Sequence, residues 1–197
     1  MNQELLYADT EKPKRRFDNL FVALLPPLSI AEDSRDRGLE LEGRHCLRGN
    51  RRPTSHSHLT LFHVGNFFGL PIDIVEASRR ACSAAAALSQ AFAFELDQAA
   101  CFGSGWKNTP LVLKRQERHF QMDRLHERVV IQFHRQGISH RKKSKKFEPH
   151  ITLSYLNGTF PTESIDPVGW MVRDLVLIHS LVGQTKYIEL GRWKLGE

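Results

Sequence analysis

Short apolar runs bounded by proline, glycine or polar residues recur along the 197-residue chain. Seven of them have the length and the β-branched or aromatic content of strands, at residues 17–25, 58–65, 93–97, 111–114, 150–155, 172–180 and 186–190. Three longer stretches, 28–42, 71–92 and 116–137, space their apolar residues as amphipathic helices do. The pattern therefore predicts a mixture of strands and helices along the whole chain beyond its first residues.

The two halves of the chain repeat a similar order of predicted elements, with strands on either side of a long helix. This order predicts an α+β fold with internal pseudo-symmetry, although the halves are too different in sequence to form a repeat array. Residues 1–16 are polar and predict an N-terminal tail, so that residues 17–197 form one domain.

Composition narrows the class of protein only moderately. The formal net charge is +6, which suits an ordinary soluble protein as well as one with an anionic partner such as RNA. The three cysteines lie far apart without CxxC grouping, which argues against a disulfide framework and favours a reducing, cytoplasmic compartment. No signal peptide and no apolar run of about 18 residues occurs, so we expect no membrane association.

One four-residue pattern occurs in both halves, as His58-Leu59-Thr60-Leu61 and His150-Ile151-Thr152-Leu153. Residues two apart on a strand point to the same face, so each histidine is expected beside its threonine. The aliphatic residues of each motif are expected on the other face, in a core. One face of each strand is thus predicted to present the reactive side chains, and the other face to pack in the core.

Two such pairs supply the groups that phosphodiester cleavage requires. A neutral imidazole with a pKa near 6.5 can accept or donate a proton at physiological pH. A threonine hydroxyl can donate a hydrogen bond to a phosphate oxygen. If the strands face each other, one histidine can activate water, the other can protonate the leaving ribose oxygen, and Thr60 and Thr152 can hold the phosphorane.

A metal site is the main alternative use of these histidines. His56, His58 and His63 are close in sequence, but no aspartate, glutamate or cysteine lies nearby to complete the coordination. We therefore predict neither a metal site nor a cofactor.

The paired motifs resemble those of the two-histidine phosphoesterases, and in particular the LigT-like RNA 2′,3′-cyclic phosphodiesterases, also called 2′-5′ RNA ligases. The resemblance extends from Phe17 to Leu195, and residues 147–153 (FEPHITL) carry it most closely. It implies a bilobal fold of two pseudo-symmetric antiparallel-sheet lobes, with helices on the outside and both motifs in a central cleft. A cleft complete within one chain makes a monomer the expectation.

The resemblance also implies roles for the four motif residues. His58 and His150 become the acid and the base, with His150 favoured as the base, and Thr60 and Thr152 bind the phosphate. Relatives often carry arginine two residues after the second motif, where this chain has Tyr155. We therefore expect another cation to substitute, or Tyr155 itself to stack on a base. The candidate substrate-binding residues are Tyr155, Phe147, Tyr187, Arg52 and Lys145.

The sequence thus predicts a metal-independent enzyme that hydrolyses 2′,3′-cyclic phosphate ends of RNA to 2′-phosphates, with 2′-5′ RNA ligation as a related activity. Two alternatives stay open. One is a non-catalytic RNA-binding module with the same fold, although pure binding needs no paired acid and base. The other is a phosphodiesterase for small cyclic nucleotides or 2′-5′ oligoadenylates.

Overall fold

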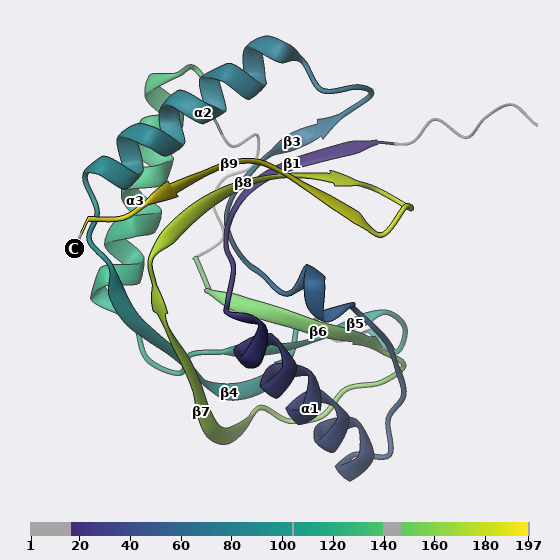
Figure 1. Ribbon diagram of the computed structural model, residues 1–197. Coiled ribbons are helices and arrows are strands. Elements are labelled where there is room, and N and C mark those ends of the chain that lie inside the picture. Colours follow the sequence, from purple (N-terminus) through teal and green to yellow (C-terminus); the bar gives the residue numbers. More distant parts are fainter. Residues whose placement is uncertain (1–16, 104, 140–146, 197) are drawn as a thin grey trace, which may run out of the picture.

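The strands predicted from the apolar runs pair into one strongly curved antiparallel sheet in the computed structural model, which describes residues 17–103, 105–139 and 147–196 (Figure 1). The strand order is β7-β4-β5-β6-β3-β1-β8-β9, and the short β2 pairs with β6. Three α-helices accompany this sheet in the described residues, so the α+β class is confirmed. The predicted N-terminal tail, residues 1–16, lies outside the described residues.

The elements follow the predicted order closely. The helices are α1 (Leu28–Arg44), α2 (Ile72–Ala87) and α3 (Phe120–Arg135), with a short 3-10 turn η1 (Thr54–His56). The strands are β1 (Asp18–Leu24), β2 (Gly49–Arg51), β3 (Leu59–Phe67), β4 (Phe92–Cys101), β5 (Thr109–Lys114), β6 (His150–Leu156), β7 (Glu163–Val172), β8 (Asp174–Leu181) and β9 (Lys186–Lys194).

The sheet consists of two four-stranded halves, β3-β1-β8-β9 and β6-β5-β4-β7, that meet at β3 and β6. Strands β3 and β6 pair at one position, where Leu59 lies opposite Ile151. The halves are therefore one continuous sheet whose junction lies at the two His-x-Thr motifs.

The helices bury the main core against this sheet. Helices α2 and α3 pack against each other on the outer side of the sheet, whereas α1 packs against β6, β7 and η1 (Figure 1). Leu59 and Ile151 are fully buried in this core, together with Leu125 of α3. Because side chains alternate along a strand, the residues on either side of Leu59 and Ile151 face away from this core.

A second, smaller cluster lies on the opposite face of the first half. Phe21 and Ala23 of β1 pack there with Val176 and Ile178 of β8, and Tyr187 of β9 covers them. These positions alternate with residues of the main core along the same strands. The cluster gives the motif face of this half a rigid apolar floor.

Some predicted boundaries were wrong, for local reasons. Strand β7 was not predicted because Asp166, Pro167 and Gly169 interrupt its pattern; β7 lies at the sheet edge, where proline is tolerated. The three-residue β2 was also missed. The helix predicted at 71–92 ends at Ala87, because the chain enters β4 at Phe92 without a glycine or proline to mark the change. None of the described helices is both long and apolar enough to cross a membrane.

Truncation of Leu59 to alanine is expected to destabilise the protein by about 2–5 kcal/mol, because the side chain is 0% exposed at the junction of the two halves. Chemical denaturation of both proteins measures this difference in the free energy of unfolding. Ile72→Ala is the control, since Ile72 is 80% exposed and its loss is expected to change stability by less than about 0.5 kcal/mol. Equal effects of the two variants would contradict the assigned core.

Candidate active site

The two His-x-Thr motifs lie side by side on neighbouring strands. Because Leu59 pairs with Ile151 in antiparallel register, His58 lies across from Thr152 and Thr60 lies across from His150. Each histidine thus neighbours the threonine of the other motif as well as its own. The sequence predicted that the motifs share a face, and the register brings all four side chains to it.

Both motifs are followed by a β-bulge at the same position. Leu61 is the extra residue where β3 pairs with β1, and Leu153 is the extra residue where β6 pairs with β5. A bulge bends its strand and redirects side chains, and bulges are common beside active sites. Leu61 is buried in the main core, and the half-buried Leu153 packs against the same core beside Gly38 of α1, as expected for the aliphatic residues of both motifs.

The two histidines are held in the same way. Nδ1 of His58 lies 2.7 Å from the carbonyl oxygen of His56, and Nδ1 of His150 lies 2.7 Å from the carbonyl oxygen of Glu148. A carbonyl oxygen can only accept, so each neutral ring carries its proton on Nδ1 and donates it to the residue two positions earlier. Each Nε2 atom is then the one available to accept or deliver a proton.

The surroundings of His58 keep its imidazole neutral. Burial of the ring lowers its pKa to about 4, and the hydrogen bond with the His56 carbonyl counteracts this only in part. The positive charge of Arg52 and the neighbouring imidazoles of His150 and His56 lower the pKa further. At neutral pH His58 is thus unprotonated and able to accept a proton.

Aromatic rings from two hairpins contact the two histidines. Tyr187, on the β8–β9 hairpin, lies edge-on to His58 with 5.6 Å between ring centroids, and Phe21 lies 4.9 Å from the same ring. Phe102, just after β4 on the β4–β5 hairpin, lies edge-on to His150 at 4.7 Å. Each half of the sheet therefore supplies a hairpin aromatic that packs edge-on against its histidine.

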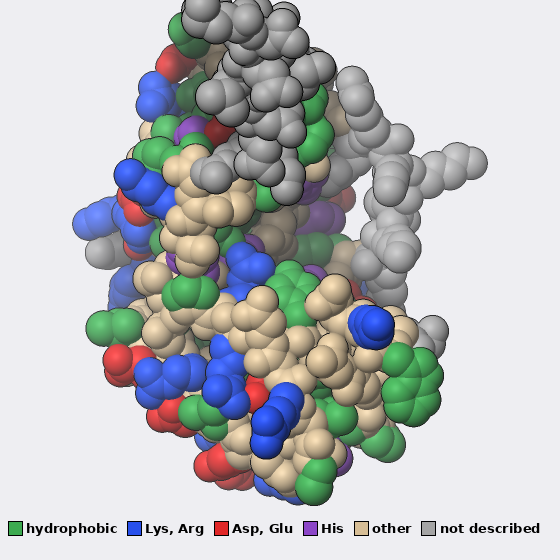
Figure 2. Space-filling view, turned by 90° about the vertical axis from the view of Figure 1, so that its right-hand side faces the viewer, with side chains coloured by type: hydrophobic (Ala, Val, Ile, Leu, Met, Phe, Trp, Pro, Cys, Tyr) green, Lys and Arg blue, Asp and Glu red, His purple; other side chains and the backbone are tan. Residues whose placement is uncertain are grey.

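Arg52, Tyr155 and Tyr187, three of the predicted substrate-binding residues, are brought together by the fold. Nη1 of Arg52 lies 3.2 Å from the Tyr155 hydroxyl, and Nη2 lies 2.8 Å from the Tyr187 hydroxyl. His56 adds a third ring, stacked on Tyr187 at 4.0 Å. Figure 2, which looks onto the open side of the molecule, shows histidine side chains inside a hollow between its upper and lower parts.

The other two candidates stand apart from this group. Phe147 stacks on His126 of α3 at 3.8 Å and lines a separate surface pocket with residues of that helix. Lys145 lies outside the described residues, so its predicted role stays a prediction. The structure therefore gathers three of the five candidates beside the motifs and places Phe147 elsewhere.

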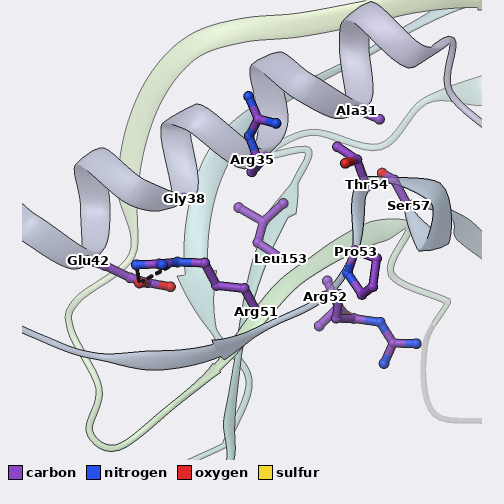
Figure 3. A pocket seen from close by; sticks show the side chains of 11 residues that line it. Ala31, Arg35, Gly38, Glu42, Arg51, Arg52, Pro53, Thr54, Ser57 and Leu153 are labelled. Atoms are coloured by element: carbon purple, nitrogen blue, oxygen red, sulfur yellow. Dashed lines mark hydrogen bonds and ion pairs between the residues drawn. The ribbon is translucent and has the colours of Figure 1, made fainter. Parts of the chain in front are cut away.

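A narrow pocket adjoins the motif face, between α1, η1 and β6. Thr152 and Leu153 form part of its wall, and Ser57 and Arg52 lie at its edge (Figure 3). The Ser57 hydroxyl is buried and has no hydrogen-bond partner among the described residues. The pocket thus places an unsatisfied hydroxyl, that of Ser57, in the same lining as Thr152 of the second motif.

Sequence reasoning missed two neighbours of the motif histidines. Phe102 and Phe21 contact His150 and His58 through pairings between distant segments, and neither carries a local signal that distinguishes it from a core residue. His56 was noted only as a possible metal ligand. In the described part of the chain no three His, Cys, Asp or Glu side chains gather in a metal-binding arrangement.

The chain belongs to the 2′-5′ RNA ligase superfamily, whose family model matches residues 27–183. This match confirms the resemblance drawn from the paired motifs. A search of curated proteins gave no match.

The fold is that of the LigT-like phosphoesterases. Escherichia coli LigT in its apo form is 22% identical with a TM-score of 0.66, and the match covers 92% of this chain and 99% of that one. The protein TT0787 of Thermus thermophilus is also 22% identical, with a TM-score of 0.69 over 91% of this chain and 99% of that one. A structure of E. coli LigT complexed with 3′-AMP matches equally well, with a TM-score of 0.66.

Proposed function

We propose that this protein is a phosphodiesterase that hydrolyses 2′,3′-cyclic phosphate ends of RNA to 2′-phosphates. The observation that carries the proposal is the matched pair of His-x-Thr motifs, with two Nε2 atoms presented on one face by identical Nδ1 hydrogen bonds. Membership of the 2′-5′ RNA ligase superfamily supports it. The 3′-AMP complex of LigT, a protein of the same fold, supports a nucleotide as the kind of ligand.

The four side chains suffice for the reaction. One histidine removes a proton from water as its oxygen attacks phosphorus, and the other protonates the 3′ oxygen as the P–O3′ bond breaks. The hydroxyls of Thr60 and Thr152 donate hydrogen bonds to the non-bridging oxygens, whose charge grows in the transition state. A 5′-hydroxyl in place of water would form a 2′-5′ bond by the same steps, which accounts for ligation as a second activity.

Product analysis in EDTA tests this function directly. The full chain is incubated with adenosine 2′,3′-cyclic phosphate and, separately, with an RNA oligonucleotide that ends in a 2′,3′-cyclic phosphate. The expected product is the 2′-phosphate in both cases, identified by ³¹P NMR, with undiminished rates in the chelator.

The outcomes separate the alternatives. RNA binding without turnover of either substrate would indicate a binding module and contradict the enzyme. Turnover of the nucleotide but not of the oligonucleotide would restrict the substrate to small cyclic nucleotides. A 3′-phosphate product would contradict the proposed direction of ring opening.

A further inference from the structure

Two neighbouring arginines before the first motif have different partners. Arg51 turns toward α1, where its Nε and Nη2 lie 3.1 and 2.7 Å from one carboxylate oxygen of the buried Glu42 (Figure 3). Arg52 points away from that pair, and the acceptors of its guanidinium are the hydroxyls of Tyr155 and Tyr187. One cation is therefore neutralised, whereas the other is held by two uncharged groups.

The charge of Arg52 has no compensating partner in the described part of the chain. A guanidinium has five N–H donors, and the two tyrosine hydroxyls satisfy only two of them. Its Nε is buried and lacks an acceptor among the described residues. A half-buried cation that has no counter-ion and has spare donors is suited to bind an anion.

Arg52 also reaches both motifs. Its backbone N–H donates to the carbonyl oxygen of Leu153 at 3.0 Å, next to Thr152, which anchors it to β6. Its guanidinium bonds to Tyr187, the ring that lies edge-on to His58. The guanidinium is therefore placed at the His58 end of the shared face, and its charge acts on both His58 and His56.

The two tyrosines are suited to hold such a group. They come from different halves of the sheet, Tyr155 from β6 and Tyr187 from β9, so they fix the guanidinium across the junction. Burial raises the pKa of Tyr187, so its hydroxyl stays protonated and keeps its own hydrogen to donate. Arg52 and the tyrosine hydroxyls together form an array of donors with one positive charge.

We propose that Arg52, positioned by Tyr155 and Tyr187, binds the phosphate of the substrate beside the two His-x-Thr motifs. The inference rests on the proposed function for the identity of the phosphate and names the cation that the motifs themselves lack. The guanidinium donates to a non-bridging phosphate oxygen through its free N–H groups, and its charge offsets that of the phosphate. Tyr155 and Tyr187 are positioning residues for this contact.

Binding of inorganic phosphate to the full chain tests the proposal without any turnover. Arg52→Met keeps the length of the side chain and removes its charge, and we expect phosphate affinity to fall about 10- to 100-fold in NMR titrations. Arg52→Lys keeps the charge but lacks the planar arrangement of guanidinium donors, so its phosphate affinity is expected to lie between those of the wild type and Arg52→Met. The charge-matched control is Arg35→Met, on the opposite wall of the adjoining pocket (Figure 3), which should bind phosphate as the wild type does.

A second readout distinguishes binding from a structural role. Loss of the Arg52 charge removes a repulsion that lowers the pKa of His58, so the NMR titration of His58 should shift upward in Arg52→Met and return toward the wild-type midpoint in Arg52→Lys. Tyr155→Phe combined with Tyr187→Phe keeps Arg52 but frees it, and is expected to weaken phosphate binding while the aromatic contacts remain. These variants keep the test available if Arg52→Met fails to fold.

Wild-type phosphate affinity in a folded Arg52→Met protein would overturn the proposal, as would an equal loss in Arg35→Met. Phosphate binding that depends on Arg52, in a protein that turns over no cyclic phosphate, would support this inference and overturn the proposed function. Turnover of adenosine 2′,3′-cyclic phosphate with an unchanged KM in Arg52→Met would support the proposed function and overturn the role of Arg52 in binding the phosphate.

Discussion

His58→Ala and His150→Ala are each expected to lower kcat for a 2′,3′-cyclic phosphate at least about 100-fold, the lower end of the contribution of a positioned acid or base. Each substitution removes one of the two Nε2 atoms that the matched Nδ1 hydrogen bonds present to the shared face. Steady-state rates with adenosine 2′,3′-cyclic phosphate measure the loss.

The double variant sharpens this expectation. Because the two histidines act on the same displacement at phosphorus, their effects should be far from additive, and the double variant should be little slower than the worse single one. His63→Ala is the matched control, since His63 lies on the same strand as the first motif but is exposed to solvent. A rate within about tenfold of wild type for either single variant would remove that histidine from the mechanism.

The sequence predicted the motif face because the rule that governs it is local. Alternation along a strand places His58 beside Thr60 and sends Leu59 to the core, whatever the rest of the chain does. The strands themselves followed from apolar runs of the right length. The two motifs were predicted to lie together because they occur in corresponding places of the two halves. The pairing of Leu59 with Ile151 places them on neighbouring strands.

The remaining features of the site depend on contacts between distant segments, which no local pattern encodes. Phe102 contacts His150 only because the fold brings the β4–β5 hairpin next to β6, and the bulge at Leu153 is defined only by the pairing of β6 with β5. Arg52 was one of several basic residues near the motifs in sequence. What distinguishes Arg52 from these residues is its hydrogen bonds with two tyrosine hydroxyls that lie 103 and 135 residues away along the chain.

The assignment of acid and base is where the structure and the family resemblance diverge. The resemblance implies His150 as the base and His58 as the acid. A residue that delivers a proton must hold it first, yet with a pKa of about 4 only about one His58 ring in a thousand is protonated at pH 7. The neutral ring of His58 can instead accept a proton from water, although burial and the positive charge of Arg52 both weaken it as a base.

A substrate with sulfur at the 3′ bridging position separates the two roles. When water attacks phosphorus and the P–S bond breaks, the thiolate leaves without needing a proton, because thiols ionise near pH 8.5. With His58 as base and His150 as acid, His150→Ala should then act within about tenfold of wild type, although it is at least about 100-fold slower on the oxygen substrate. His58→Ala should stay slow on both substrates.

Formation of the product, which carries a 3′-thiol and a 2′-phosphate on the same ribose, is measured with a thiol reagent. Cys46 is exposed, so the reagent is added to quenched samples or corrected with protein alone. Rescue of His58→Ala instead of His150→Ala would make His58 the acid and restore the assignment that the resemblance implies. Rescue of His150→Ala alone would show that the half-buried His58 of the first motif activates the water, and that the more exposed His150 of the second motif serves the leaving group.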